Sequence, residues 1–147
     1  MWKRSGNTVL SKFFSLSTRK KMTQAKLVEF KEILRSKSEH RKPDKQASKL
    51  LFYLFTSTRG GYTRLRIIML LLEQSYNTHQ LAQKLELDYK AIQHHMKVLE
   101  KNNMILKTGE KYGAVFYLST FLEVNIGALD MAIDKLEQKM NQKKVYL

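Results

Sequence analysis

In the middle of the chain the hydrophobic period changes from helical to β, and this change limits the possible folds more than any other feature. Residues 79–86 and 89–101 repeat apolar side chains at helical spacing, and a short turn containing Leu87 separates them. Residues 104–108 and 114–118 are short runs rich in β-formers, and they flank a loop with two glycines, GEKYG. Two helices followed at once by a hairpin predict a helix-turn-helix with a β wing.

Polar side chains indicate where these two helices begin and end. Thr78 is expected to cap the first helix and Asp88 the second, because their oxygens accept the unpaired N–H groups of a first turn. Asn102 and Asn103 are expected to end the second helix, since asparagine tolerates the left-handed backbone of a C-terminal cap. A two-stranded hairpin is marginal alone, so we expect the wing to pack on the helices.

Further helices are expected around this motif, at residues 23–38, 45–58, 64–74 and 121–141. Leu27, Phe30 and Leu34 form an apolar stripe on the first of them. Thr63 is expected to cap the helix at 64–74. The helix at 45–58 contains LLFYLF and is apolar on most sides, so its own domain or a second copy must cover it.

The last helix carries a heptad seam. Its apolar side chains follow gaps of 4, 3, 4, 3 and 4 residues: Leu122, Ile126, Leu129, Ile133, Leu136 and Met140. Such a stripe packs either on its own domain or on another chain. Because the stripe is narrow and residues 120–147 carry no net charge, we favour packing against a second copy.

The charge of the chain is strongly positive. There are 27 Lys and Arg residues against 13 Asp and Glu, and the whole excess of +14 lies in residues 1–119. A field of this sign suits a polyanion such as nucleic acid or an anionic membrane; the alternative is a soluble protein with a basic surface. No apolar run approaches the ~20 residues of a membrane span. Residues 1–21 are basic, serine-rich and free of acid, as in transit peptides; we expect a flexible basic arm, with Met22 as an alternative start.

The adjacent histidines raise the question of a metal site. On a helical wheel, Ile92, Met96 and Leu99 point inward, His95 borders this stripe and His94 points outward. Neighbouring residues on a helix do not face each other, so these two do not readily share a metal ion. The chain has no cysteine, which excludes disulfides and thiolate zinc sites. We predict neither a metal nor a cofactor.

The outward side of helix 89–101 suits the major groove of DNA. Its side chains are long and polar and none is acidic; lysine can bond guanine or a phosphate, and glutamine can bond an adenine edge. Hairpin residues can reach a phosphate or a minor groove. The predicted DNA contacts are Lys90, Gln93, His94 and Lys97 on the helix, Lys107, Lys111 and Tyr112 on the hairpin, and Arg64, Thr78 and His79 before the helix.

From about Lys49 to Ser119 the chain resembles winged helix-turn-helix regulators of the ArsR-like type, particularly archaeal ones. The resemblance rests on LFYLFTSTRGGYTRLRIIMLLL, NTHQLAQKLELDYKAIQHHMKVLEKNNMI and YGAVFYLS, and its most specific element is the HH-hydrophobic-x-x-L run. It implies a dimeric transcription factor on a near-palindromic operator, with base reading by 89–101. It also implies a dimer built from helices 45–57 and 121–141, with Leu51, Phe52, Leu54 and Phe55 beside the seam. The chain departs from the family in having no metal-sensing cysteines, and Glu86 and Asn103 stand near places where the family often has glycine.

We therefore expect a mainly α chain with a small β-hairpin wing. A basic arm (1–44), a DNA-binding domain (45–119) and a C-terminal dimerisation helix (120–147) would form a homodimeric, sequence-specific regulator of double-stranded DNA in the cytoplasm, associated with the nucleoid. The alternative is a winged-helix subunit or adaptor that binds proteins. The scattered tyrosines argue against a single-strand binder, and no catalytic constellation is present. The sequence points to no particular small-molecule effector.

Overall fold

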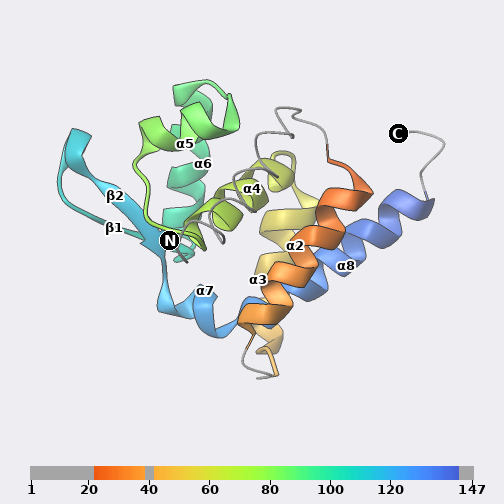
Figure 1. The fold of residues 1–147 in the computed structure, drawn as a ribbon. Coiled ribbons are helices and arrows are strands. Elements are labelled where there is room, and N and C mark those ends of the chain that lie inside the picture. The colour runs from red at the N-terminus through yellow and green to blue at the C-terminus, as the bar shows by residue number, and fades with distance from the viewer. Residues whose placement is uncertain (1–21, 39–41, 143–147) are drawn as a thin grey trace, which may run out of the picture. The chain divides into compact units, whose positions relative to one another are not determined.

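The computed structural model describes residues 22–38 and 42–142, and it has the expected class: helices with one antiparallel hairpin (Figure 1). The hairpin follows the helix-turn-helix directly, as in a winged helix-turn-helix. The elements are α2 (Gln24–Lys37), α3 (Lys45–Phe52), the π-helix η1 (Tyr53–Ser57), α4 (Gly61–Leu71), α5 (Thr78–Leu85), α6 (Tyr89–Lys101), β1 (Ile105–Thr108), the 3₁₀ turn η2 (Lys111–Gly113), β2 (Val115–Leu118), α7 (Thr120–Val124) and α8 (Ile126–Gln142).

The described residues form two compact units. One runs from Arg66 to Ser119 and contains α5, α6 and the hairpin; the other combines the described residues of 22–65 with residues 120–142. Helix α4 contributes to both units. Residues 44 and 45, between which we predicted a boundary, both lie in the second unit, where α2 and α3 pack on α8.

In the first unit, side-chain caps set the ends of both helices of the motif. Helix α5 begins one residue earlier than predicted: Asn77, not Thr78, is its cap, and Asn77 and Gln80 form a reciprocal capping box. The prediction for α6 is confirmed, since Asp88 accepts from the backbone N–H of Lys90 at 3.0 Å. Glu86 ends α5 with a left-handed φ of 54°, a conformation that glycine adopts most readily.

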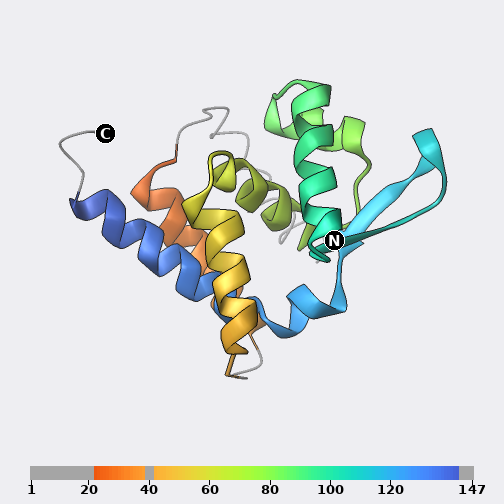
Figure 2. The same ribbon diagram turned by 180° about the vertical axis from the view of Figure 1, so that it is seen from behind.

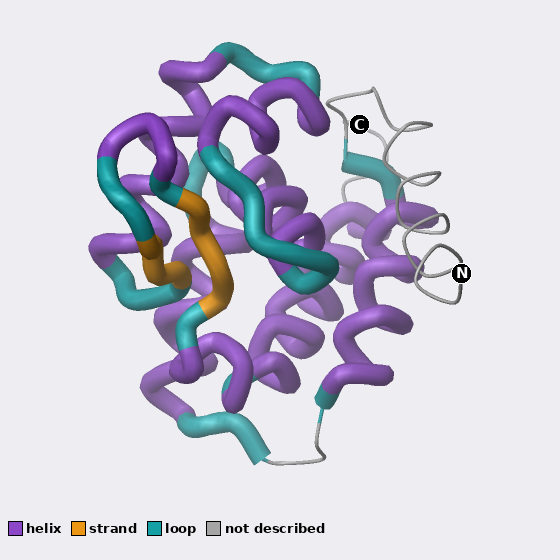
Figure 3. The backbone as a smooth tube through the Cα atoms, turned by 60° about the vertical axis from the view of Figure 1, so that its left-hand side comes forward, coloured by secondary structure: helices purple, strands orange, loops and turns teal. Residues whose placement is uncertain are grey.

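The hairpin is anchored at its base. Strands β1 and β2 pair antiparallel from Ile105 with Leu118 to Thr108 with Val115 (orange in Figure 3). Tyr76, in the connection before α5, exchanges both backbone hydrogen bonds with Phe116 of β2, at 3.3 and 2.8 Å. This bridge joins the wing to the segment that starts the helix-turn-helix, which supplies the support that an isolated hairpin lacks.

In the second unit, α2 lies beside α8 when viewed from either side (Figures 1 and 2). The predicted stripe of α2 is buried, with Leu27, Phe30 and Leu34 all at 0% exposure. Thr23 caps the helix through its hydroxyl, so α2 begins one residue after the predicted start. The amphipathic helix predicted at 23–38 is therefore confirmed, and its apolar face packs within its own chain.

The helix predicted at 121–141 is interrupted. Asn125 separates α7 from α8 and is buried; its side-chain amide donates to the carbonyl of Phe121 at 2.8 Å. The side-chain oxygen Oδ1 of Asn125 accepts a hydrogen bond from the backbone N–H of Asp44 at 3.4 Å. An asparagine side chain competes with helical hydrogen bonds in this way, which explains the break that the apolar spacing did not reveal.

The heptad seam packs inside the chain, so our preference for an intermolecular coil was wrong. Leu122, Leu129 and Ile133 are at 0% exposure, and Ile126 and Leu136 are also buried. Both α2 and α3 of the same chain pack on α8. Side chains already buried this way cannot form a dimer surface. The same holds for Leu51, Leu54 and Phe55, whereas Phe52 and Met140 remain partly exposed.

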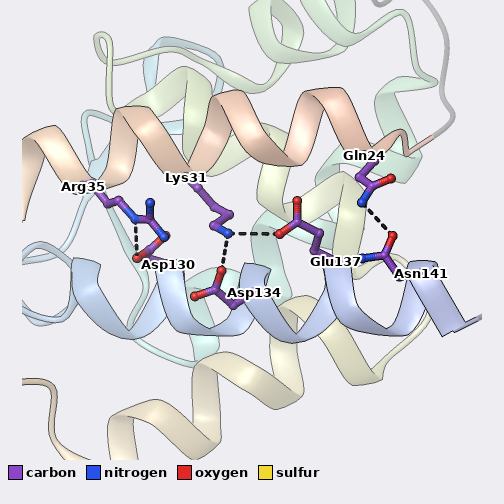
Figure 4. Close-up of polar contacts among 7 residues, drawn as sticks. All are labelled: Gln24, Lys31, Arg35, Asp130, Asp134, Glu137 and Asn141. Atoms are coloured by element: carbon purple, nitrogen blue, oxygen red, sulfur yellow. Dashed lines mark hydrogen bonds and ion pairs between the residues drawn. The ribbon is translucent and has the colours of Figure 1, made fainter.

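Polar contacts accompany this packing (Figure 4). Lys31 of α2 pairs with Asp134 and, at 3.0 Å, with Glu137; Arg35 pairs with Asp130 at 3.2 Å. The hydrogen bond to Asp134 is the largest cause of the raised pKa of Lys31. The acids of α8 thus face the cations of α2, so the neutrality of residues 120–147 reflects a partner helix within the chain.

Helix α4 begins at Gly61, so Thr63 lies within its first turn and is not the cap that we predicted. A Cβ on Gly61 would lie 2.6 Å from the carbonyl oxygen of Phe55. Only glycine permits this close approach after the π-helix, which places the end of η1 directly against the start of α4.

We predict that Ile133→Ala lowers the free energy of unfolding by about 2–5 kcal/mol, because it leaves a cavity between packed helices. Gln138→Ala is the matched control on the same helix; its side chain is exposed, so the change should stay within about 0.5 kcal/mol. Urea unfolding measures both values. A loss for Ile133→Ala that changes markedly with protein concentration would contradict intramolecular packing of the seam.

Candidate nucleic-acid interface

Helix α6 presents its polar side outward, as predicted. Ile92, Met96 and Leu99 are at 0–2% exposure, and this buried stripe fixes the rotation of the helix. The predicted contacts Lys90, Gln93, His94 and Lys97 are all exposed.

The two histidines occupy the environments that the helical wheel indicated. His94 is exposed and His95 is half-buried. Their rings meet edge-on, with centroids 5.5 Å apart and planes at 63°. Among the residues that the structure describes, no group of three or more His, Cys, Asp or Glu side chains is arranged to hold a metal ion.

A groove of about 610 Å³ lies within the first unit, beside the outward side of α6. Three segments form it: the start of α5, one side of α6, and the hairpin. Its lining residues are Asn77, Thr78, His79, Tyr89, Gln93, Met96, Lys97, Glu100, Lys107, Lys111, Ala114 and Phe116. We call this the α6–wing groove.

The α6–wing groove combines an apolar floor with a basic rim. Met96, Ala114 and Phe116 are buried, whereas Lys97, Lys107 and Lys111 are exposed. Lysine ammonium groups along a concave surface raise the local potential and attract phosphate oxygens. The shape and charge suit a segment of polyanion backbone.

Six of the ten predicted contact residues line this groove. Lys90, His94 and Arg64 do not. The groove contains Thr78, His79, Gln93, Lys97, Lys107 and Lys111. Lys90 and His94 are exposed on α6 but do not line it. The side chain of Tyr112 lies outside the described part of the structure.

Arg64 does not belong to this surface, which corrects our prediction of a phosphate contact. Its side chain is only 4% exposed and lies in the second unit. The guanidinium donates to the carbonyl of Leu54 through Nε at 3.1 Å and a terminal nitrogen at 2.9 Å, and also to Thr58. Burial lowers the pKa of Arg64. Its hydrogen bonds satisfy the π-helix, so it serves the fold.

Six groove residues were not among the predicted contacts, and three of these carry polar side-chain groups: Asn77, Tyr89 and Glu100. Tyr89 is 42% exposed and opens α6. Glu100 is the only acid among the lining residues, and its carboxylate lies 3.9 Å from the ammonium of Lys107. Helical spacing could have placed Glu100 on this side of α6, since it lies three residues after Lys97 and seven after Gln93.

The connection before α5 carries a partly buried carboxyl group. Burial raises the pKa of Glu73, and the positive charge of Lys84 acts in the opposite direction. The ammonium of Lys84 also lies 5.3 Å from the ring centroid of Tyr76, which is almost fully buried. These residues support the segment that bridges to the wing.

Comparison with known proteins gives one match to a family. Residues 62–107 match the sequence model of the bacterial regulatory protein, arsR family. This segment is similar to the helix-turn-helix of that family. It covers α5, α6 and most of α4, and it supports a DNA-binding transcription regulator.

A further likeness comes from the solved structure of reduced HlyU from Vibrio cholerae N16961. It is 20% identical over 64% of this chain and 90% of that chain, with a TM-score of 0.44. No curated protein matches the sequence. In the described part of the chain, no helix is both long and apolar enough to cross a membrane.

We predict that Glu73→Gln stabilises the protein at pH 7 and has little effect near pH 3.5. A raised carboxyl pKa means that the folded state holds its proton more tightly, so stability falls as pH rises from the ordinary glutamate pKa through the folded value. The neutral glutamine avoids this loss. Urea midpoints of both proteins at the two pH values test the prediction, and an equal gain at both would show that titration is not its cause.

Proposed function

We propose that this protein is a sequence-specific regulator of transcription that binds double-stranded DNA, with α6 in the major groove and the wing over the adjacent backbone. One observation carries the proposal: Gln93 and Lys97 of α6 converge with Lys107 and Lys111 of the wing on a single groove. The match of residues 62–107 to the arsR family supports the same reading.

The position of each exposed side chain suggests its role on the duplex. Lys90, Gln93 and His94 lie on the outward side of α6, where side chains meet base edges in helix-turn-helix complexes. The lysines of the wing lie beside the groove and suit the phosphate backbone. Base contacts would set specificity, and phosphate contacts would supply most of the affinity.

The proposal includes a homodimer, formed on a different surface from the seam. Phe52 and Met131 line an apolar hollow of about 280 Å³ on the face of α3 and α8. Met131 is 50% exposed and Tyr53 of η1 is 57% exposed. Two-fold pairing of two copies would match an inverted repeat in DNA. The ammonium groups of Lys135 and Lys139 lie 5.7 and 5.1 Å from the ring centroid of Phe52, so the lysines border this face.

Selection of bound duplexes from a random pool tests sequence reading directly. An enriched inverted repeat is expected for a homodimer that reads bases, and a single enriched half-site is expected for a monomer. Tight binding without any enrichment would reject sequence-specific regulation and favour the adaptor alternative. The logarithm of affinity should fall with the logarithm of salt concentration by about 0.9 per phosphate contacted.

We predict that Gln93→Ala and Lys111→Gln weaken binding in different ways. The first should cost about 1–3 kcal/mol on the selected duplex and little on a random one, because it removes a base contact. The second should weaken both duplexes alike and make the salt dependence shallower by about 0.9. Fluorescence anisotropy titrations measure all four affinities. The same pattern for both variants would show that these roles are wrongly assigned.

We predict that Met131→Asp shifts the protein from dimer to monomer at micromolar concentration, because it places a charge in the apolar hollow. Val28→Asp is the matched control, since Val28 is an exposed apolar residue on α2 that does not line the hollow. Sedimentation velocity measures the oligomeric state. Wild-type protein that stays monomeric at tens of micromolar, with and without duplex, would reject the homodimer.

A further inference from the structure

We infer that Glu100 is a positioning residue, which holds Lys107 in the protein without DNA and thereby limits the affinity of the α6–wing groove for phosphate. This inference rests on the proposed function. Its basis is the placement of one carboxylate in a groove that otherwise suits an anion.

The geometry places Glu100 between the two parts of the interface. It lies in the last turn of α6, and Lys107 lies on β1 opposite Phe116 of β2. The carboxylate oxygen is 3.9 Å from the lysine ammonium, with side-chain exposures of 37% and 53%. Both side chains line the groove, so their pairing spans from the recognition helix to the wing.

The charges of the lining residues determine how the ion pair between Glu100 and Lys107 affects phosphate binding. Lys97, Lys107 and Lys111 are the basic groups, and Glu100 is the only acid. A phosphate entering the groove meets one ammonium that already has a carboxylate beside it. Lys107 must leave Glu100 before it can pair fully with the phosphate, so the energy of the existing ion pair is lost when phosphate binds.

This exchange has a thermodynamic signature. A lysine that binds phosphate releases a condensed cation from the DNA, which makes affinity depend on salt. A carboxylate that loses its lysine attracts a cation from solution and so offsets part of that release. The wild-type protein should therefore show a shallower salt dependence than its lysines alone would give.

The test compares Glu100→Gln with Glu123→Gln. Both variants remove one negative charge from an exposed or half-exposed glutamate, but Glu123 lies on α7 and does not line the groove. Glu100→Gln should raise affinity for duplex DNA about two- to fivefold at 0.1 M salt, as expected for losing an exposed ion pair. It should also steepen the salt dependence by up to about 0.9. Glu123→Gln should change neither quantity appreciably.

A double-mutant cycle with Lys107→Gln shows whether Glu100 acts through Lys107. In the Lys107→Gln background, the effect of Glu100→Gln on affinity and on salt dependence should shrink to that of Glu123→Gln. An undiminished effect would overturn the positioning role and indicate direct repulsion of phosphate. A loss of folding stability alone would not alter the salt dependence, so this readout separates positioning from a structural role.

Elution from immobilised heparin separates failure of this inference from failure of the proposed function. Heparin is a polyanion without base edges, so Glu100→Gln should elute at higher salt than Glu123→Gln whether or not the protein reads duplex DNA. Later elution by Glu100→Gln with no duplex binding by the wild type would reject the regulator and retain the role of Glu100. Equal behaviour of the two variants on heparin and on duplex would overturn the inference.

Discussion

The candidate interface depends on the burial of one narrow stripe of α6. Ile92, Met96 and Leu99 together remove a substantial apolar area from water, and no other rotation of the helix would bury all three. The polar side chains on the opposite side are exposed as a consequence. Asp88 fixes where the helix starts, so position along its axis is set as well as rotation.

Features set by neighbouring residues could be predicted from the sequence. The cap at Asp88, the left-handed Asn103 and the hairpin at GEKYG follow from local chemistry. The predicted start of α5 was wrong by one residue, because Asn77 and Thr78 are both good N-caps. The Gln80 side chain favours Asn77, since it completes a box only with the residue three positions before it.

Features set by distant residues could not be predicted in this way. A heptad pattern indicates that an apolar stripe is buried, but it does not indicate whether the same chain or a second copy covers the stripe. The opposing charges of α2 and α8 meet across about a hundred residues of sequence, as Lys31 and Glu137 do. Arg64 shows the same limit, because an arginine ahead of a DNA-binding motif has the same sequence signature whether it meets a phosphate or the carbonyl of Leu54.

The α6–wing groove could be predicted only in part, because some of its contacts are set by neighbouring residues and others by distant ones. Exposure of Gln93 and Lys97 follows from helical periodicity, and their approach to the wing follows from the short link between α6 and β1. The approach of Glu100 to Lys107 could not be predicted, because Lys107 lies beyond the end of the helix and its direction depends on the twist of the hairpin.

The bridge between Tyr76 and Phe116 confines any adjustment of the wing to its outer end. The base of the hairpin is held by backbone pairing on two sides, whereas Gly109 has a φ of 93° and Gly113 has open space around its Cα. Insertions or deletions between Gly109 and Gly113 would change how far Lys111 extends from the wing and would leave the packed helices undisturbed. Relatives of this protein could therefore acquire a different footprint on DNA by exchanging a short tip while keeping the same core.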